Sequence, residues 1–136
     1  MRVFLDTNIL LDVLEQRAPH DADSLNVLQC CGTRGHQVFM AWHSLANVFY
    51  IYGLKAGEAT ARKALQELLQ VVTIATVGHE QALRAFTLGF TDLEDALQTV
   101  SAESCSAQCI ITRNGPDFAA SPVPVLTPVE FLLQYP

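Results

Sequence analysis

The chain has 136 residues, half of them hydrophobic, and a formal net charge of −6. This length and apolar content favour one domain over residues 1–136 with a sizeable core, and the negative charge argues against a protein that coats nucleic acid through a broad basic face. No apolar run reaches the ~20 residues of a membrane helix, and Asp6 comes too early for a signal peptide. We therefore expect a cytoplasmic protein with no membrane partner.

Short apolar strands and amphipathic helices alternate along the chain. Strands are expected at 2–5, 37–40, 71–74, 110–112 and 125–126. Helices are expected at 8–15, 22–34, from 43 or 44 to 52, 57–69, 80–88, 93–106 and 127–134, with Gly53 and Gly89 ending two of them. This pattern predicts an α/β fold in which a mostly parallel sheet of four to five strands has helices on both faces.

The four cysteines are Cys30, Cys31, Cys105 and Cys109. No two of them have the CxxC spacing that is typical of a zinc knuckle. We expect them to be free thiols that serve as small core residues.

Several acids and one amide follow or precede strands in a way that places them together. Asp6 directly follows the first strand, Asn114 and Asp117 follow the fourth, and Asp92 and Asp95 begin the helix that leads into the fourth. Ligands of open parallel sheets bind beyond the carboxyl ends of the strands, where the strand order reverses. The sequence therefore predicts one pocket for these side chains.

Three of these acids, Asp6, Asp95 and Asp117, are the expected ligands of a divalent metal. Clustered carboxylates repel one another unless a cation neutralises them. Oxygen ligands suit Mg²⁺ or Mn²⁺, and these ions can activate water for hydrolysis of a phosphodiester.

Each acid also has a purely structural interpretation. Asp6 could cap the helix that follows it, and Asp92 could complement a helix dipole. Thr91 and Glu94 have the spacing of a capping box, so Glu94 is expected to be structural, and Asp117 could belong to a turn. The recurrence of acids at one end of the sheet is what favours a shared site.

Three segments carry a resemblance to a known family. They read VFLDTN at 3–8, DLEDALQ at 92–98, and ITRN at 111–114 followed by Asp117 and Phe118. In order, spacing and total length they resemble the PIN-domain ribonucleases, especially the VapC-like toxins of bacterial toxin–antitoxin pairs. The resemblance covers essentially the whole chain. It implies a three-layer PIN-like fold, Mg²⁺- or Mn²⁺-dependent cleavage of RNA, a cognate antitoxin as partner, and a homodimer.

The resemblance also implies roles for particular residues. The family's first acid matches Asp6, its third matches Asp95, and its last matches Asp117, with Asn114 beside it. Thr112 is similar to the family hydroxyl that helps to position the site.

The sequence departs from the family at the second acid. The family often has Glu on the helix after the second strand, and Asn47 stands at that position. Asparagine can bind a metal or orient water but brings no charge, so the change bears on the second metal site and on the level of activity. Asp92 and Glu94 are the acids that could replace the lost charge.

Two basic residues near these motifs have open interpretations. Arg113 is read equally as a contact to a substrate phosphate and as a salt bridge to the acidic pocket. His43 is near the predicted pocket and could face it, but a non-catalytic surface histidine is favoured. The leading function is a metal-dependent endoribonuclease toxin, and the alternative is a weakened PIN-like domain that binds RNA or a protein. A haloacid-dehalogenase-like phosphatase would need an acid where Asn8 stands, and no Gly-rich turn supports a dinucleotide-binding module.

Overall fold

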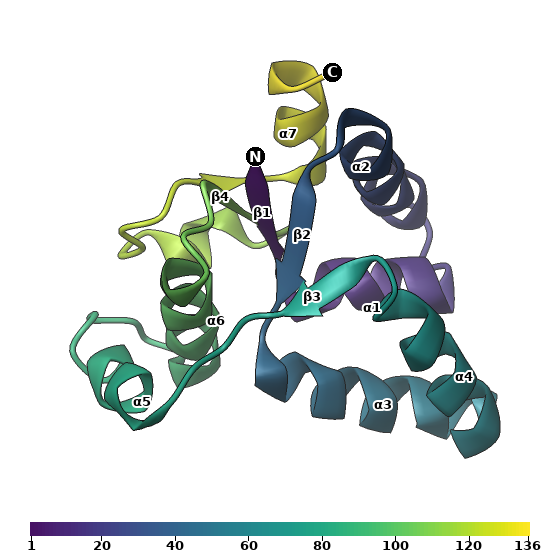
Figure 1. The fold of residues 1–136 in the computed structure, drawn as a ribbon, viewed down its shortest axis with the longest axis horizontal. Coiled ribbons are helices and arrows are strands. Elements are labelled where there is room, and N and C mark those ends of the chain that lie inside the picture. Colours follow the sequence, from purple (N-terminus) through teal and green to yellow (C-terminus); the bar gives the residue numbers. More distant parts are fainter.

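The computed structural model describes residues 1–136, with a central sheet flanked by helices (Figure 1). The strands are Arg2–Leu5 (β1), Gln37–Met40 (β2), Val72–Ile74 (β3), Cys109–Ile111 (β4) and Val125–Leu126 (β5). The helices are Thr7–Glu15 (α1), Asp21–Arg34 (α2), Trp42–Ala56 (α3), Glu58–Leu68 (α4), His79–Ala85 (α5), Leu93–Ser104 (α6) and Pro128–Gln134 (α7), and a 3₁₀ helix spans Gly115–Phe118.

The sheet is parallel throughout, with the strand order β3-β2-β1-β4-β5. Val3 of β1 pairs with Val38 on one side and with Cys109 on the other. The chain moves outward from β1 to β3 and then returns to β4 on the opposite side of β1. The strand order therefore reverses between β1 and β4, where a ligand site is expected.

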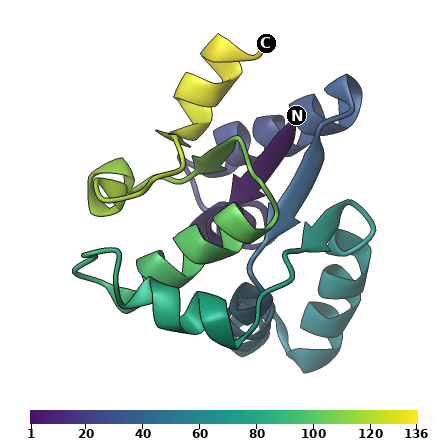
Figure 2. The same ribbon diagram turned by 60° about the vertical axis from the view of Figure 1, so that its left-hand side comes forward.

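Alternate residues of each strand enter cores on opposite faces of the sheet. Val3 and Leu5 pack into the larger core with residues of α1, α2, α3, α4 and α7. Phe4 and Ile110 face the smaller core, which contains residues of α6. Figure 2 shows α5 and α6 in front of the sheet and α1 and α2 behind it. The three-layer α/β fold predicted from the sequence is thus confirmed.

Two glycines do not end helices where the sequence pattern placed them. Helix α3 runs through Gly53 to Ala56, and a Cβ at Gly53 would make only an ordinary contact of 3.8 Å with the Cβ of Ala61. The chain turns instead at Gly57, whose φ of +92° disfavours any other residue. Helix α5 ends at Ala85, well before Gly89.

The cysteines are free thiols, as expected. Cys31, Cys105 and Cys109 are buried, and Cys30 is half-buried. None of the helices combines the length and the apolar character that spanning a membrane requires.

Candidate active site

Asp6 and Thr112 meet at the carboxyl ends of the two strands between which the order reverses. Asp6 is only 3% exposed. Its Oδ1 accepts a hydrogen bond from the backbone amide of Thr7 (2.8 Å), and its Oδ2 accepts one from the hydroxyl of Thr112 (2.8 Å). Asp6 is also the N-cap of α1. Its two interpretations are therefore compatible, because one carboxylate oxygen caps the helix and the other faces β4.

Helix α6 begins differently from the sequence prediction. Its N-cap is Asp92, whose side chain accepts a hydrogen bond from the amide of Glu94 (2.9 Å). The predicted capping box between Thr91 and Glu94 is therefore wrong. The extended backbone that precedes the helix includes Asp92 (φ −102°, ψ 118°), so the capping position lies one residue later. The Glu94 side chain is thereby free for contacts with other elements.

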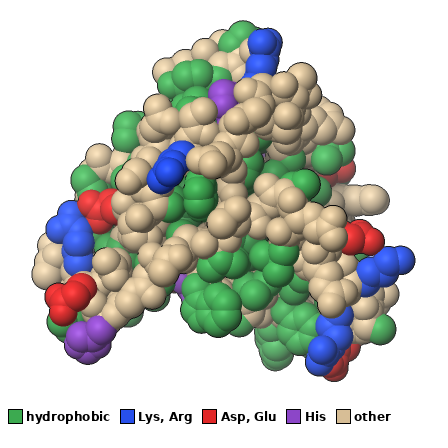
Figure 3. Space-filling model, viewed as in Figure 1, with side chains coloured by type: hydrophobic (Ala, Val, Ile, Leu, Met, Phe, Trp, Pro, Cys, Tyr) green, Lys and Arg blue, Asp and Glu red, His purple; other side chains and the backbone are tan.

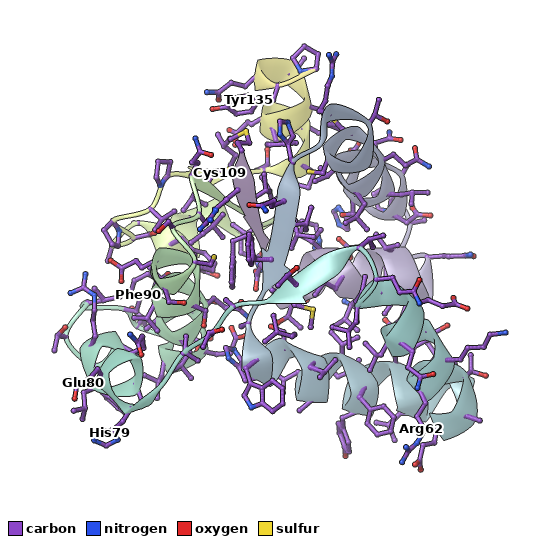
Figure 4. All side chains as sticks on the ribbon, in the orientation of Figure 1. Arg62, His79, Glu80, Phe90, Cys109 and Tyr135 are labelled. Atoms are coloured by element: carbon purple, nitrogen blue, oxygen red, sulfur yellow. The ribbon has the colours of Figure 1, made fainter.

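The acids at the start of α6 share a pocket with the end of the 3₁₀ helix. Asp92, Asp95 and Asp117 line a cavity of about 380 Å³. Phe90, which also lines it and is labelled in Figure 4, meets the ring of Phe118 edge to face at 5.9 Å. An apolar wall thus supports a largely acidic rim.

The predicted convergence of Asp6, Asp95 and Asp117 is only partly seen. Asp95 and Asp117 share the pocket, whereas Asp6 does not line it. No group of three or more His, Cys, Asp or Glu side chains is placed to hold a metal ion. The three predicted ligands therefore do not form a ready three-carboxylate cage.

The carboxylates nevertheless influence one another through their charges. Burial, together with the negative charges of Asp6, Glu94 and Asp92, raises the pKa of Asp95 to about 7. Burial raises the pKa of Asp6 to about 6, and the charge of Glu94 adds to this effect against the opposing hydrogen bond from Thr112. The site therefore concentrates negative charge, and the positive charge of Arg113 offsets only part of the upward shift at Asp6.

This donor set fits a hard divalent cation. Mg²⁺ is commonly bound through one or two carboxylates and keeps several waters, so it does not need a cage made only of protein ligands. A bound cation would replace the protons on these carboxyl groups as the neutralising charge, so the donors must be able to ionise when it binds. The chemistry of Asp6 and Asp95 meets this requirement.

A polar network that the sequence analysis missed joins three helices beside these acids. Gln98 Nε2 lies 2.7 Å from Glu94 Oε1, 2.8 Å from Thr7 Oγ1 and 2.9 Å from Ser44 Oγ. His43 Nε2 lies 3.2 Å from the same oxygen of Glu94. The only local signal was the i, i+4 spacing of Glu94 and Gln98.

These contacts favour the charged form of Glu94, in contrast to Asp6 and Asp95, whose pKa values are raised. Burial by itself would raise the pKa of Glu94, but hydrogen bonds from His43 and Gln98 outweigh it and hold the pKa below its ordinary value. The His43 ring is half-buried against Glu94, so it faces the acids, as one of its two interpretations allowed. The expectation that it is not catalytic stays a prediction.

The two asparagines of the predicted site lie at its margins. Asn47 is exposed on α3, one helical turn after His43 and on the same face, and it does not line the pocket of Asp95. Asn114 is exposed, and its backbone amide donates to the Thr112 hydroxyl (3.1 Å). A direct role for either side chain stays a prediction.

Arg113 is held by an acid that the sequence analysis did not single out. Its Nε donates to Asp12 Oδ2 (2.8 Å) and its Nη2 to Asp12 Oδ1 (3.1 Å). Asp12 is fully buried in α1 and also accepts from the Ser24 hydroxyl (3.1 Å). Arg113 thus forms the salt bridge that one of its two interpretations predicted, but with α1 and not with the acidic pocket.

Asp95→Asn is expected to stabilise the metal-free protein at pH 8. The folded-state pKa of Asp95, about 7, lies above the value of an unfolded aspartate, about 4. The stability associated with its proton is therefore fully present below about pH 4 and is lost as the pH rises towards 7. Asparagine does not titrate, so the gain at pH 8 should be about 1–2 kcal/mol after solvent screening is allowed for.

Urea unfolding in EDTA at pH 8 and pH 4.5 measures this effect. The gain in unfolding free energy should shrink at pH 4.5, where most of the wild-type carboxyl is protonated in the folded state. An equal gain at both pH values would show that the charge of Asp95 is not its cause.

An apolar groove lies between α3 and α4, next to His43. It has a volume of about 650 Å³, and its walls include Trp42, Leu45 and Phe49. Arg62, labelled in Figure 4, extends from α4, and its guanidinium lies over the Phe49 ring at 5.8 Å. Figure 3 shows hydrophobic side chains gathered over the region of α3 and α4. Exposed apolar surface of this kind is typical of an interaction site.

Comparisons with known proteins agree with this architecture. A family model described as PIN domain matches residues 2–115. Among solved structures, VapBC2 from Rickettsia felis bound to a promoter DNA fragment has a TM-score of 0.75 at 17% identity, with 93% of this chain and 98% of that chain covered.

Two further solved structures are similar. A toxin–antitoxin complex from Klebsiella pneumoniae has a TM-score of 0.71 at 26% identity, with coverage of 93% and 97%. VapC20 from Mycobacterium tuberculosis, described as a Sarcin-Ricin loop cleaving toxin, has a TM-score of 0.68 at 15% identity, with coverage of 87% and 94%. No curated protein matches the chain.

Proposed function

The chain belongs to the PIN domain family, and on this premise we propose that it is a Mg²⁺- or Mn²⁺-dependent endoribonuclease, the toxin of a toxin–antitoxin pair. The observation that carries the proposal is the position of Asp6. It lies where the strand order reverses, is fixed by Thr112, and is close enough to Asp95 for its negative charge to raise the pKa of Asp95. RNA as the substrate places the protein in the cytoplasm.

The residues of the site would divide the work of phosphodiester hydrolysis. Asp6 and Asp95 would hold the cation, and Asp117 lines the pocket of Asp95 together with Asp92. A bound Mg²⁺ or Mn²⁺ would supply positive charge for the phosphate and polarise a water for attack on phosphorus. The hydroxyl of Thr112 keeps one oxygen of Asp6 in a fixed direction, and Asn114 follows directly beyond it. Because the net charge is −6, affinity for bulk RNA should be low and a preferred target should be cut faster.

The purified protein is expected to cleave single-stranded RNA internally with Mg²⁺ or Mn²⁺ present. EDTA should stop the reaction, and restoring the metal should restart it. Mn²⁺ should also raise the melting temperature in a concentration-dependent way, because it binds the folded acidic site and not the unfolded chain. The rise should be smaller in Asp95→Asn. Cleavage that continues in EDTA, or equal thermal shifts in both proteins, would count against the metal site.

A second candidate is a PIN domain with weakened catalysis that binds RNA or a protein partner. It is favoured by Asn47, which leaves α3 without an acid here, and by the lack of a three-ligand cage. RNA binding without cleavage in Mn²⁺, measured with the same substrates, would make this the better assignment.

An antitoxin is the protein partner that we propose. Its place would be the apolar groove between α3 and α4, since Trp42 and Leu69, which line it, are 65% and 41% exposed and such surface is normally covered in stable assemblies. Several similar solved structures are toxin–antitoxin complexes. The homodimer implied by the family resemblance stays a prediction, which light scattering of the purified protein would test.

A further inference from the structure

We propose that Glu94 supplies the carboxylate that helix α3 lacks, and that His43 and Gln98 hold it in place at the site. The inference rests on the proposed function and names a further residue for the same site. It moves the missing acid from position 47 of α3 to the first turn of α6. Asn47 is then no sign of lost activity, because another element carries the charge.

The orientation of Gln98 follows from the chemistry of its partner. A carboxylate can only accept hydrogen bonds when ionised, so the side-chain nitrogen of Gln98, and not its oxygen, must face Glu94 at 2.7 Å. The oxygen Oε1 is then left as the only buried side-chain nitrogen or oxygen in the protein without a hydrogen-bond partner. An unpaired buried polar atom costs about 1–3 kcal/mol. If Gln98 serves to fix the direction of Glu94, this role explains why a fully buried glutamine with an unpaired oxygen is present.

His43 contributes a second donor from the neighbouring helix. Its Nε2 lies 3.2 Å from Glu94 Oε1 and 3.3 Å from Gln98 Nε2. In the tautomer that carries a proton on Nε2, His43 donates to the carboxylate. Helix α3 therefore provides a hydrogen-bond donor at His43. One turn later, on the same face, Asn47 stands at the position where the family often has an acid. In this arrangement α3 supplies the hydrogen-bond donor, His43, and α6 supplies the carboxylate, Glu94.

The contact between Glu94 and His43 leaves the Glu94 carboxylate accessible to a cation. The Glu94 side chain is 36% exposed and the His43 side chain 29%, so the carboxylate keeps an open side. The ion pair of Glu58 and Arg62, by contrast, is about two-thirds exposed and lies within α4 alone. Glu94 thus combines fixed direction with access for a cation.

Glu94→Gln is expected to weaken Mn²⁺ binding by about 10- to 100-fold, the loss that is usual when a group that tunes a metal site is removed. Titration calorimetry measures the affinity, and circular dichroism checks that the variant is folded. Glu67→Gln is the matched control, since Glu67 is an exposed glutamate of α4, and its affinity should equal that of the wild type. Asn47→Glu added to Glu94→Gln should restore most of the affinity by returning a charge to α3.

His43→Gln tests the positioning role. Alone it should weaken Mn²⁺ binding less than Glu94→Gln does, and combined with Glu94→Gln it should cause no further loss, because the residue that it orients is absent. Additive losses would overturn the positioning role. If Glu94→Gln does not fold, the loss of affinity in His43→Gln carries the test.

The outcomes separate this inference from the proposed function. Wild-type protein that neither binds Mn²⁺ nor cleaves RNA would overturn both. Wild-type protein that binds and cleaves, together with Glu94→Gln that binds Mn²⁺ equally well, would overturn only the role of Glu94.

Discussion

Asp6→Asn is expected to lower the rate of RNA cleavage by at least about a hundredfold while the protein stays folded. The carboxylate supplies charge to a cation whose stabilisation of the reaction amounts to several kcal/mol, and each 1.4 kcal/mol is about tenfold in rate. Asparagine can still cap α1, because its side-chain oxygen can accept the hydrogen bond from the Thr7 amide. The measurement is the initial rate on a labelled single-stranded RNA at saturating Mn²⁺.

The control for this variant is Asp21→Asn. Asp21 lies in the first turn of α2, away from the site, and its replacement removes the same charge. Its rate should match that of the wild type. If Asp6→Asn cleaves as fast as this control, either the activity comes from a contaminant or Asp6 does not act in the reaction.

Arg113→Met is expected to lower the free energy of unfolding by about 3 kcal/mol or more. The substitution leaves Asp12 fully buried with only the Ser24 hydroxyl as partner. Breaking a buried ion pair by removing one member typically costs about 3–5 kcal/mol, because an uncompensated charge stays in the interior. Urea denaturation at pH 7 measures the loss, and the slope of the transition checks that it stays two-state.

Arg62→Met provides the comparison on the surface. The pair of Arg62 with Glu58 is exposed, so its loss should cost less than about 1 kcal/mol. Asp12→Leu added to Arg113→Met should recover much of the stability, because an apolar pair replaces the buried ions. Equal losses in Arg113→Met and Arg62→Met would mean that water reaches Asp12 and compensates its charge.

The sheet and the position of Asp6 were accessible from the sequence because their signals are local. Residues 3–5 and 109–111 are apolar without a break, and an acid follows the first run directly. Burial of both faces of a parallel sheet requires such runs. Topology predicts that polar residues near the ends of these strands lie at one end of the sheet, and the Thr112 hydroxyl donates to Asp6 there. One pocket for all the predicted site residues stays a prediction.

The parts that were missed depend on contacts between distant segments. Gln98 and Ser44 are 54 residues apart, and Arg113 and Asp12 are 101 apart. No residue close to Asp12 in the sequence predicts that Arg113 is its partner. A single acid among the leucines of α1 is also what an ordinary amphipathic helix with one solvent-exposed face contains. The capping prediction for Thr91 failed for a related reason, since Asp92 satisfies the same local rule one residue later.

The order in which the strands join the sheet has a consequence for the protein while it is being made. β1 leaves the ribosome first, yet its second neighbour is β4, at Cys109–Ile111. Asp6 therefore lacks Thr112 for most of translation, and the acidic pocket is complete only after Asp117 has emerged. The groove between α3 and α4 belongs to residues 42–69, which emerge well before that point. On the proposed function, a nascent chain cannot cleave RNA until Thr112 and Asp117 have emerged, and an inhibitor that binds the groove can engage it before then.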